Sequence, residues 1–481
     1  MFTRALLTDL YELTMAYGYW RAGKDRDEAV FHLIFRNAPF EGGYAIAAGL
    51  EEAMRYLDAL HFTRDDLDYL ASLEGNDAAR LFPDDFLRFL GGMRFTCDVD
   101  AIAEGTVVFA QEPLLRVRGP VAQAQIVETA LLNIINFQTL IATKAARIVH
   151  AAQGDAVVDF GLRRAQGNDG AVSAARAAYI GGVVGTSNVL AGAINGIPVK
   201  GTHAHSWVMS FNSELEAFQT YADVMPNNVL LLVDTYDTLQ GVANAIEVAK
   251  KLRASGHKFV GIRLDSGDLA YLSIEARRML AEAGFPAATI AASNDLDEHL
   301  IASLKEQKAE IDFWGVGTRL ITAFDQPALG GVYKLGAMRR EGGQWQHRIK
   351  ISEQVTKVSI PGMLQVRRFV VDDGGAIGDM IWDELSGEPS MTMVDPSDLT
   401  RRKTFVHPVA SRDLLVPVYR GGKRVYESPS LDAIRAHRGR DLALFHAAIK
   451  RFVNPHRYPV GVEQTLFDLR TRMILDARAS R

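Results

Sequence analysis

The chain has 481 residues, 48% hydrophobic and 23% charged, which is the balance of a globular protein with a large core. It carries 53 Lys and Arg against 58 Asp and Glu, and the net charge of −5 argues against nucleic acid as the main partner. Its one cysteine, Cys97, excludes an internal disulfide, a cysteine-rich zinc site and an iron–sulfur cluster, and it fits a reducing compartment.

Neither a secretion signal nor a membrane span is expected. Asp9 and Glu12 interrupt the apolar stretch near the start of the chain. The segment most similar to a membrane span, residues 179–199, contains five glycines and Pro198, and it is predicted to be a tightly packed turn and helix. We therefore expect a cytoplasmic protein without membrane contact.

Residues 1–120 are predicted to form an N-terminal mixed α+β domain. Apolar residues at helical spacing predict two helices, and β-branched and apolar runs predict three strands. The helices are expected at residues 6–20 and 49–60, and the strands at 29–36, 98–110 and 114–117.

Residues 121–340 show the rhythm of β–α units. A long helix over residues 121–152 is followed by six short apolar runs, whose ends are 23 to about 40 residues apart, far enough for a helix between each pair of parallel strands. These six predicted strands are residues 156–160, 196–199, 229–234, 259–265, 289–293 and 311–316, and residues 330–335 are a seventh. This pattern predicts an α/β fold, either a parallel barrel or an open doubly wound sheet.

Polar residues follow nearly every one of these runs, among them Arg163, His205, Thr235, Asp268, Asn294 and Thr318. Polar side chains at many strand ends are typical of a barrel active site, so we favour an irregular parallel α/β barrel as the catalytic domain. After about residue 340 the pattern stops, and residues 341–481 are predicted to form a C-terminal region that packs back on the other two.

Two basic motifs at strand ends are candidate binding elements. Arg163 and Arg164 can bind a phosphate or carboxylate through two hydrogen bonds each, although a surface ion pair would explain them equally simply. His203 and His205 could be a metal pair, structural histidines, or include a nucleophile that accepts a phosphoryl group. A metal site would need further ligands of the same kind, and no other histidine directly follows a predicted strand.

Carboxylates and glycines complete the candidate pocket. Asp234 and Asp265 suit Mg²⁺ or ribose hydroxyls, although either could instead cap a helix. Arg263 adds an anion-binding group, and Gly317 with Thr318 could let the backbone approach a phosphate, unless they form only a tight turn. Together these residues predict a pocket for a phosphorylated sugar, with Mg²⁺ and a nucleophilic histidine.

The motifs, taken in order from about residue 6 to about 362, resemble the nicotinate phosphoribosyltransferase family of type II phosphoribosyltransferases. The segments that carry the resemblance are TDLYELTMAYGYW (8–20), DFGLRRAQG (159–167), GTSNVLAG (185–192), GTHAHS (201–206), VDTYDT (233–238), RLDSGDL (263–269), ASNDL (292–296) and GVGTRLITAFDQPALGGVYKL (315–335). The remaining C-terminal residues match less distinctly. Some members carry a cysteine-rich metal element, which one cysteine cannot supply.

The resemblance implies that nicotinate and 5-phosphoribosyl 1-diphosphate are converted to nicotinate mononucleotide and diphosphate in NAD biosynthesis, with ATP hydrolysis coupled to the transfer. It also implies an N-terminal mixed domain on an irregular α/β barrel, and a homodimer with the site at the subunit interface.

The resemblance also implies roles for single residues. Phe160 and Tyr11, the latter from the partner chain, are similar to the aromatic pair around the pyridine ring, and Arg263 resembles the group that binds the nicotinate carboxylate. Thr202 would face the substrate, and Ser187 stands where relatives that use nicotinamide carry an aspartate. The ribose 5-phosphate would be held by Arg163, Gly317 and Thr318.

Three residues acquire catalytic roles by the same resemblance. His205 matches the phosphoacceptor, while Asp234 and Asp265 would hold the ribose hydroxyls and, through Asp265, the Mg²⁺-diphosphate. Two other interpretations remain open from the sequence: a metal-dependent hydrolase built on His203 and His205, and a non-catalytic nucleotide-binding protein on the same scaffold.

Overall fold

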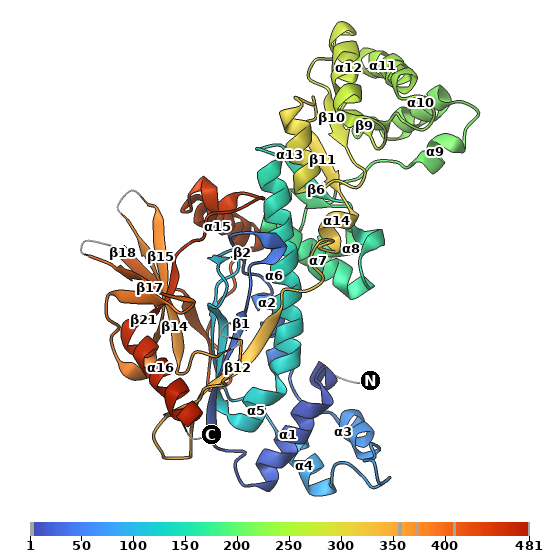
Figure 1. Cartoon of the computed structure of the whole chain (residues 1–481). Helices are drawn as coiled ribbons and strands as arrows, with labels where there is room; N and C mark the ends of the chain where they lie inside the picture. The colour runs from blue at the N-terminus through green and yellow to red at the C-terminus, as the bar shows by residue number, and fades with distance from the viewer. Residues whose placement is uncertain (1–3, 355–357, 372–373, 407–409, 480–481) are drawn as a thin grey trace. The chain divides into compact units, whose positions relative to one another are not determined.

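The computed structural model describes residues 4–354, 358–371, 374–406 and 410–479 (Figure 1). The chain forms two compact units, one of Met1–Leu140 with Ala328–Arg481 and one of Ile141–Pro327. The N-terminal and C-terminal regions expected from the sequence therefore belong to the same unit. No helix in the described ranges is both long enough and apolar enough to cross a membrane.

The first unit is built on a seven-stranded sheet in the order β13-β12-β1-β5-β3-β19-β20, in which neighbouring strands are antiparallel. Its strands are β1 (Glu28–Phe35), β3 (Asp98–Ile102), β5 (Pro113–Pro120), β12 (Gly331–Arg339), β13 (Gln346–His347), β19 (Leu415–Arg420) and β20 (Lys423–Arg424). The two predicted N-terminal helices are confirmed as α1 (Leu10–Arg21) and α2 (Leu50–Asp58), and α3 (Arg64–Ala71) and α4 (Asp84–Gly92) follow.

Two predictions for this unit need correction. The single strand expected at residues 98–110 is interrupted after β3, and β4 (Val107–Val108) pairs with β2 (Ala45–Ile46) in a separate small sheet. The turn lies at Gly105, where φ is +83° and a Cβ would come within 2.7 Å of the Ile434 carbonyl oxygen, so only glycine fits. The strand expected at residues 330–335 is β12, which pairs with β1 and belongs to this antiparallel sheet.

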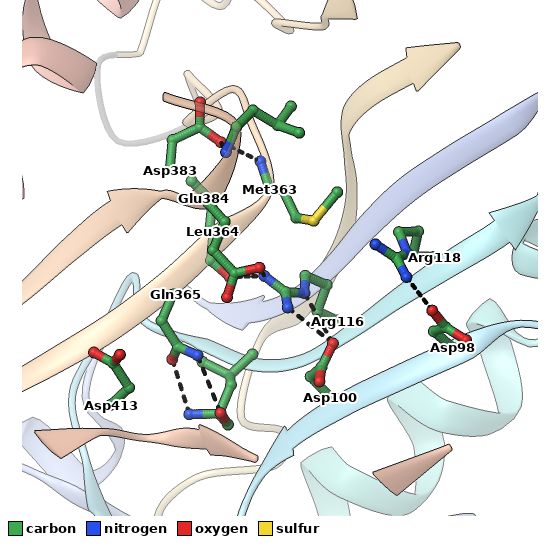
Figure 2. A network of polar contacts seen from close by, with 12 residues as sticks. Asp98, Asp100, Arg116, Arg118, Met363, Leu364, Gln365, Asp383, Glu384 and Asp413 are labelled. Carbon is green, nitrogen blue, oxygen red and sulfur yellow. Dashed lines mark hydrogen bonds and ion pairs between the residues drawn. The ribbon is translucent and has the colours of Figure 1, made fainter. Parts of the chain in front are cut away.

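A second sheet of the first unit comes from the C-terminal residues, in the order β17-β16-β21-β15-β14-β18. Its elements are β14 (Leu364–Val370), β15 (Ala376–Asp383), β16 (Thr392–Asp395), β17 (Asp398–Thr404), β18 (Ala410–Asp413) and β21 (Val460–Glu463), with α15 (Leu431–Ala443) and α16 (Gln464–Ala479). Arg116 of β5 joins the two sheets: its guanidinium donates to Asp100 at 2.8 Å and to the Leu364 carbonyl at 3.1 Å, and it pairs with Glu384 (Figure 2).

The second unit contains a sheet of six parallel strands in the order β7-β6-β11-β10-β9-β8. Its strands are β6 (Ala156–Asp159), β7 (Gly185–Thr186), β8 (Leu230–Leu232), β9 (Gly261–Leu264), β10 (Thr289–Ala292) and β11 (Phe313–Val316). The helices between them are α7 (Asn168–Gly181), α8 (Val189–Asn195), α9 (His205–Met209), α10 (Glu214–Val224), α11 (Thr238–Ala254), α12 (Leu269–Glu282) and α13 (Glu298–Glu306), and α14 (Thr318–Ile321) follows β11. A mixed α/β protein with a parallel sheet is confirmed.

The strand predicted at residues 196–199 is wrong. Val199 makes only an isolated parallel bridge to Thr186, and the strand at this place is the two-residue β7. The long helix predicted at residues 121–152 is present as two helices, α5 (Val121–Ile126) and α6 (Glu128–Ala151), separated at Val127.

The segment of residues 198–203 contacts both edge strands of the parallel sheet. On one side Val199 bridges Thr186 of β7. On the other side the Thr202 hydroxyl donates to the Leu230 carbonyl of β8 at 2.6 Å, and the Leu232 N–H donates to Nε2 of His203 at 3.3 Å. These contacts place the GTHAHS motif between the two edges of the sheet.

Candidate active site

A cleft of about 480 Å³ lies at the carboxyl ends of the parallel strands, and the second unit supplies all of its lining. The structure brings together there most of the residues predicted from the sequence: Phe160, Arg163, Arg164, Ser187, Thr202, His205, Arg263, Asp265, Gly317 and Thr318. The shared edge explains this convergence, because the carboxyl ends of parallel strands meet on one side of a sheet.

Phe160 is positioned by the backbone of its neighbour strand. Its N–H donates to the Val316 carbonyl at 2.8 Å, which extends the pairing of β6 with β11 by one residue. A Cβ built on Gly315 would lie 2.5 Å from two carbon atoms of the Phe160 ring. The ring therefore lies directly over the Gly315 backbone, and glycine at this position makes the space for it.

A buried carboxylate, Asp159, fixes the adjoining strand ends. One oxygen accepts from the Gly161 N–H at 2.8 Å and the other accepts from the Thr186 hydroxyl at 2.7 Å. Burial raises the pKa of this carboxyl, and the two hydrogen bonds oppose the shift. Asp159 thus ties β6 to β7 and holds Phe160 and Ser187, which follow these strands, at the cleft.

Asp234 and Asp265 are linked to each other across neighbouring strands. Oδ2 of Asp234 accepts from the Asp265 N–H at 2.9 Å and from the Ser266 hydroxyl at 2.6 Å. Oδ1 of Asp234 is buried and has no hydrogen-bond partner among the described residues. Burying a hydrogen-bond acceptor without a partner costs free energy of folding. This oxygen is therefore a candidate ligand for a hydroxyl group or a cation.

The helix-cap alternative for these two aspartates is excluded by their neighbours. Asp237 caps α11 by accepting from the Gln240 N–H at 2.8 Å, and Asp268 caps α12 by accepting from the Tyr271 N–H at 3.1 Å. Asp234 and Asp265 therefore do not cap these helices. Asp265 instead accepts a hydrogen bond from the Ser293 hydroxyl.

His205 stands at the first position of α9 with its two ring nitrogens in different surroundings. Nδ1 lies 3.1 Å from the Thr235 hydroxyl, within hydrogen-bond distance, and Nε2 lies 3.7 Å from Oδ2 of Asp265. When Nδ1 carries the proton and donates to Thr235, Nε2 has its lone pair available for nucleophilic attack.

His203 is occupied structurally. Nε2 accepts from the Leu232 N–H, Nδ1 lies 3.4 Å from the Ala204 carbonyl, and the ring packs edge-on against Tyr221. Burial lowers the pKa of His203 to about 4, so the ring is neutral near pH 7. In the described ranges no group of three or more His, Cys, Asp or Glu side chains is arranged to hold a metal ion. Nothing here favours the hydrolase interpretation.

Arg263 projects a cation toward this cleft with little compensation. Its Nε is buried and has no hydrogen-bond partner in the described structure. Burial lowers the pKa of the guanidinium, although Asp265 and Asp234 act in the opposite direction. A partly desolvated guanidinium of this kind is suited to a carboxylate or phosphate ligand.

Three family models match the chain: the nicotinate phosphoribosyltransferase N-terminal domain at residues 6–136, the nicotinate phosphoribosyltransferase family at 156–359 and the C-terminal domain at 364–470. The chain belongs to the nicotinate phosphoribosyltransferase family. The C-terminal match extends the resemblance seen in the sequence beyond residue 362.

Full-length relatives agree with the family models. The chain is 45% identical to nicotinate phosphoribosyltransferase of Bacillus subtilis, over 99% of this chain and 96% of the relative. It is similar to the crystal structure of human nicotinic acid phosphoribosyltransferase, with a TM-score of 0.84, 32% identity, and coverage of 98% of this chain and 100% of the human one. A nicotinate-nucleotide pyrophosphorylase from Pyrococcus furiosus, 22% identical with a TM-score of 0.69, shares the fold.

Among the nicotinate phosphoribosyltransferase motifs, several residues at the cleft received no role from the sequence. Ser293 and Thr235 hydrogen-bond to Asp265 and His205, Asp159 ties two strand ends, and Asn294 has a φ of +92°. All of them end a strand or lie within three residues after one, and this position was the signal available in the sequence. Their hydrogen bonds join different strands and so could not be inferred from spacing.

Tyr11 is the one predicted family residue that lies in the first unit. It stands on α1, with 46% of its surface exposed. Burial, together with the charges of Glu128 and Glu12, raises its pKa to about 12, so the phenol stays protonated. The side chain is accessible to a second molecule.

Proposed function

We propose that this chain transfers the phosphoribosyl group of 5-phosphoribosyl 1-diphosphate to nicotinate, forming nicotinate mononucleotide and diphosphate, in NAD biosynthesis. ATP hydrolysis is coupled to the transfer. The observation that carries the proposal is the meeting of Phe160, Arg263, Asp265 and His205 in one cleft, in a chain whose whole length matches this family.

Nicotinate has a flat ring and a carboxylate, and the cleft offers a partner for each. The Phe160 ring stacks on the pyridine, which contributes about 0.5–1.5 kcal/mol beyond the burial of its area. Arg263 forms an ion pair with the nicotinate carboxylate. Asp265 and Asp234 only partly compensate the charge of this guanidinium, and its Nε has no hydrogen-bond partner among the described residues. Ser187 is neutral and does not repel the acid, as an aspartate there would.

The sugar diphosphate lies against the remaining lining and against Asp234, which is hydrogen-bonded to the Asp265 backbone beside the cleft. Arg163, Gly317 and Thr318 hold the 5-phosphate, and Asp234 and Asp265 hold the ribose hydroxyls, with Thr202 beside them. Their carboxylates also stabilise the positive charge that develops on the ribose when diphosphate leaves. The unpartnered Asp234 oxygen and the Asp265 carboxylate suit Mg²⁺, which when bound with the diphosphate neutralises its charge.

His205 is the phosphoacceptor for ATP. Its Nε2 lone pair attacks the γ-phosphorus of ATP, the bond to the bridging oxygen breaks, and ADP leaves. Thr235 acts as a positioning residue, because its hydroxyl accepts from Nδ1 and keeps the proton there. The phosphohistidine is later hydrolysed, which couples ATP to the transfer.

The parallel sheet closes into an irregular barrel. The strand order β7-β6-β11-β10-β9-β8 is the chain order cut once, between β7 and β8, and read as a circle. Residues 198–203 contact both of these edges, so they take the place of a seventh strand in the gap.

The chain works as a homodimer with the site at the subunit interface. α1 and the turn before it expose apolar side chains beside Tyr11, and α8 in the other unit does the same: Leu7, Leu10 and Met15 on the first, Val189, Leu190 and Ile194 on the second. Apolar faces of this kind are typical of subunit interfaces. Pairing them would bring Tyr11 of the partner subunit to the nicotinate site.

Product analysis tests the proposed function. Purified protein is incubated with nicotinate and 5-phosphoribosyl 1-diphosphate, with and without ATP and Mg²⁺, and the products are separated by chromatography. Nicotinate mononucleotide should appear, in larger amount with ATP. Its absence under both conditions would refute the function.

The variant Arg263→Ala should raise the KM for nicotinate by about 10- to 100-fold, because a charge-assisted hydrogen bond contributes about 1.5–3 kcal/mol. The KM for the sugar diphosphate should change much less. Steady-state kinetics with each substrate varied in turn measures both. The exposed Arg278 of α12 provides the matched control, and Arg278→Ala should leave both values unchanged. Equal effects of Arg263→Ala on the two substrates would contradict its carboxylate role.

The variant Thr235→Val should lower the rate of His205 phosphorylation by about fivefold, the value of one neutral hydrogen bond, and should let some phosphate appear on Nδ1. Phosphorus NMR of the denatured phosphoenzyme distinguishes the two nitrogens. Thr235→Ser keeps the hydroxyl and should behave like the parent chain. Phosphorylation of Nε2 alone at the parent rate in Thr235→Val would exclude a positioning role for Thr235.

A further inference from the structure

The first unit contains a second cavity, of about 490 Å³, which shares no residue with the active-site cleft. It lies among the loop after β1, the C-terminal segment of residues 455–462 and α16. A smaller neighbouring cavity of about 250 Å³ shares Asp395, Arg457, Tyr458, Val460 and Gly461 with it. We refer to the two together as the arginine cavity. Volumes in this range are those of sites for small molecules.

The lining of the arginine cavity is strongly basic. It includes six cationic side chains and only two acidic ones, Glu41 and Asp395, so the formal charge of the lining is 6 − 2 = +4 in a chain whose net charge is −5. The cationic residues are Arg36, Arg401, Arg402, Lys403, Arg457 and Arg470. A concave surface with one sign of charge concentrates ligands of the opposite sign.

Arg470 of α16 is the one buried cation of this set. The residue is only 6% exposed. Its Nε donates to the Ser359 carbonyl at 3.2 Å and its Nη2 to the Val358 carbonyl at 3.3 Å, and no carboxylate in the described ranges forms an ion pair with it. Burial lowers the pKa of this guanidinium. A buried cation that meets only carbonyl groups is stabilised when an anion binds beside it.

Arg457 adds a second cation at the rim of the cavity. It contacts the Ser397 hydroxyl at 3.1 Å and Asp395 at 3.3 Å, and most of its side chain is exposed. The rest of the lining combines apolar and aromatic side chains, among them Ile360, Ile381, Pro455 and Tyr458, with the polar residues Asn37, Gln111, Ser397 and His456. A lining that offers both cations and apolar surface suits a ligand that carries a phosphate together with a flat, weakly polar group.

We propose that the arginine cavity binds a nucleoside phosphate at a site separate from the active-site cleft. The phosphate lies against Arg470 and Arg457, and the base lies on the apolar lining. This assigns a binding role to the C-terminal residues, which hold no part of the cleft.

Hydrogen–deuterium exchange of the full chain, read by mass spectrometry with adenosine 5′-monophosphate as the probe, tests the proposal. The probe should slow exchange in peptides that cover residues 358–360 and 455–462. Arg470→Gln, which retains a donor for the carbonyl groups but removes the charge, should raise the half-saturating concentration for that protection by about tenfold. Arg457→Gln should raise it less. Arg472→Gln, an exposed position on the same helix, should leave it unchanged.

Several results would overturn the proposal. The probe could fail to protect these peptides, or it could protect only peptides of the active-site cleft. Alternatively, inorganic phosphate at the same concentration could protect them equally, which would show that the nucleoside contributes nothing to binding. If circular dichroism shows that Arg470→Gln is not folded, Arg457→Gln is used as the test variant instead. A half-saturating concentration equal to that of the parent chain in Arg457→Gln would then refute the site. Because the readout locates the peptides, the outcome is independent of the catalytic proposal.

Discussion

The variant His205→Ala should still form nicotinate mononucleotide from nicotinate and 5-phosphoribosyl 1-diphosphate, but ATP should no longer increase the rate. The variant keeps Phe160, Arg263 and Asp265 of the cleft, so it retains the groups that we propose bind and orient the substrates. It lacks the imidazole of the cleft lining, His205, whose Nε2 is left available by its neighbours. Initial rates with and without ATP, together with the ADP released per turnover, measure the effect.

The exposed His257 gives the matched control, since His257→Ala removes an imidazole of the same unit outside the cleft. That variant should keep full stimulation by ATP. A His205→Ala enzyme that responds to ATP as the parent does would show that phosphate is not carried on this residue. Loss of basal transfer together with stimulation would instead mean that His205 also contacts the substrates.

The variant Arg368→Met should lower the free energy of unfolding of the first unit by about 3–5 kcal/mol, because removing one partner of a buried ion pair leaves the other charge uncompensated. The Arg368 guanidinium is fully buried and pairs with Asp379 at 2.6 Å and with Asp441 at 3.1 Å. It also donates to the Val107 carbonyl at 2.7 Å, and this bond joins β14 to the small β2–β4 sheet. Urea unfolding followed by circular dichroism measures the loss.

The adjacent Arg367 serves as a control that distinguishes the effect of burying an ion pair from the effect of removing a charge. It pairs with Asp413 at 2.8 Å, but both side chains are partly exposed, so Arg367→Met should cost no more than about 1 kcal/mol. Equal losses in the two variants would mean that the buried network around Arg368 adds nothing beyond an ordinary surface pair.

The sequence was most informative where a local rule applied. Periodicity placed β1, α1 and α2, and the runs before Phe160, Asp234, Asp265 and Gly317 are strands of one parallel sheet. Since such strands end on one edge, the residues after them were expected to meet; Phe160, Asp265 and Gly317 line the cleft, whereas Asp234 is not part of its lining and hydrogen-bonds to the Asp265 backbone. The arrangement of the site therefore follows from strand ends more than from any single residue.

The sequence failed where partners lie far apart in the chain. Residues 196–199 and 330–335 are apolar and look like barrel strands, but one makes a single bridge and the other pairs with β1. The two-residue strand β7 contains no apolar run from which a strand could have been predicted. The Ser293–Asp265 and Thr235–His205 contacts also depend on which strands become neighbours, and short patterns do not specify that.

The few contacts of residues 198–203 with the edge strands β7 and β8 determine how firmly the GTHAHS motif is held. Elsewhere in the parallel sheet each strand is fixed by a ladder of backbone hydrogen bonds, but here one bridge on one side and two side-chain contacts on the other carry the connection. Detaching this stretch breaks few bonds, so it should open locally at a lower free energy than the strands around it. His205 directly follows this stretch, so a local opening should also displace its imidazole.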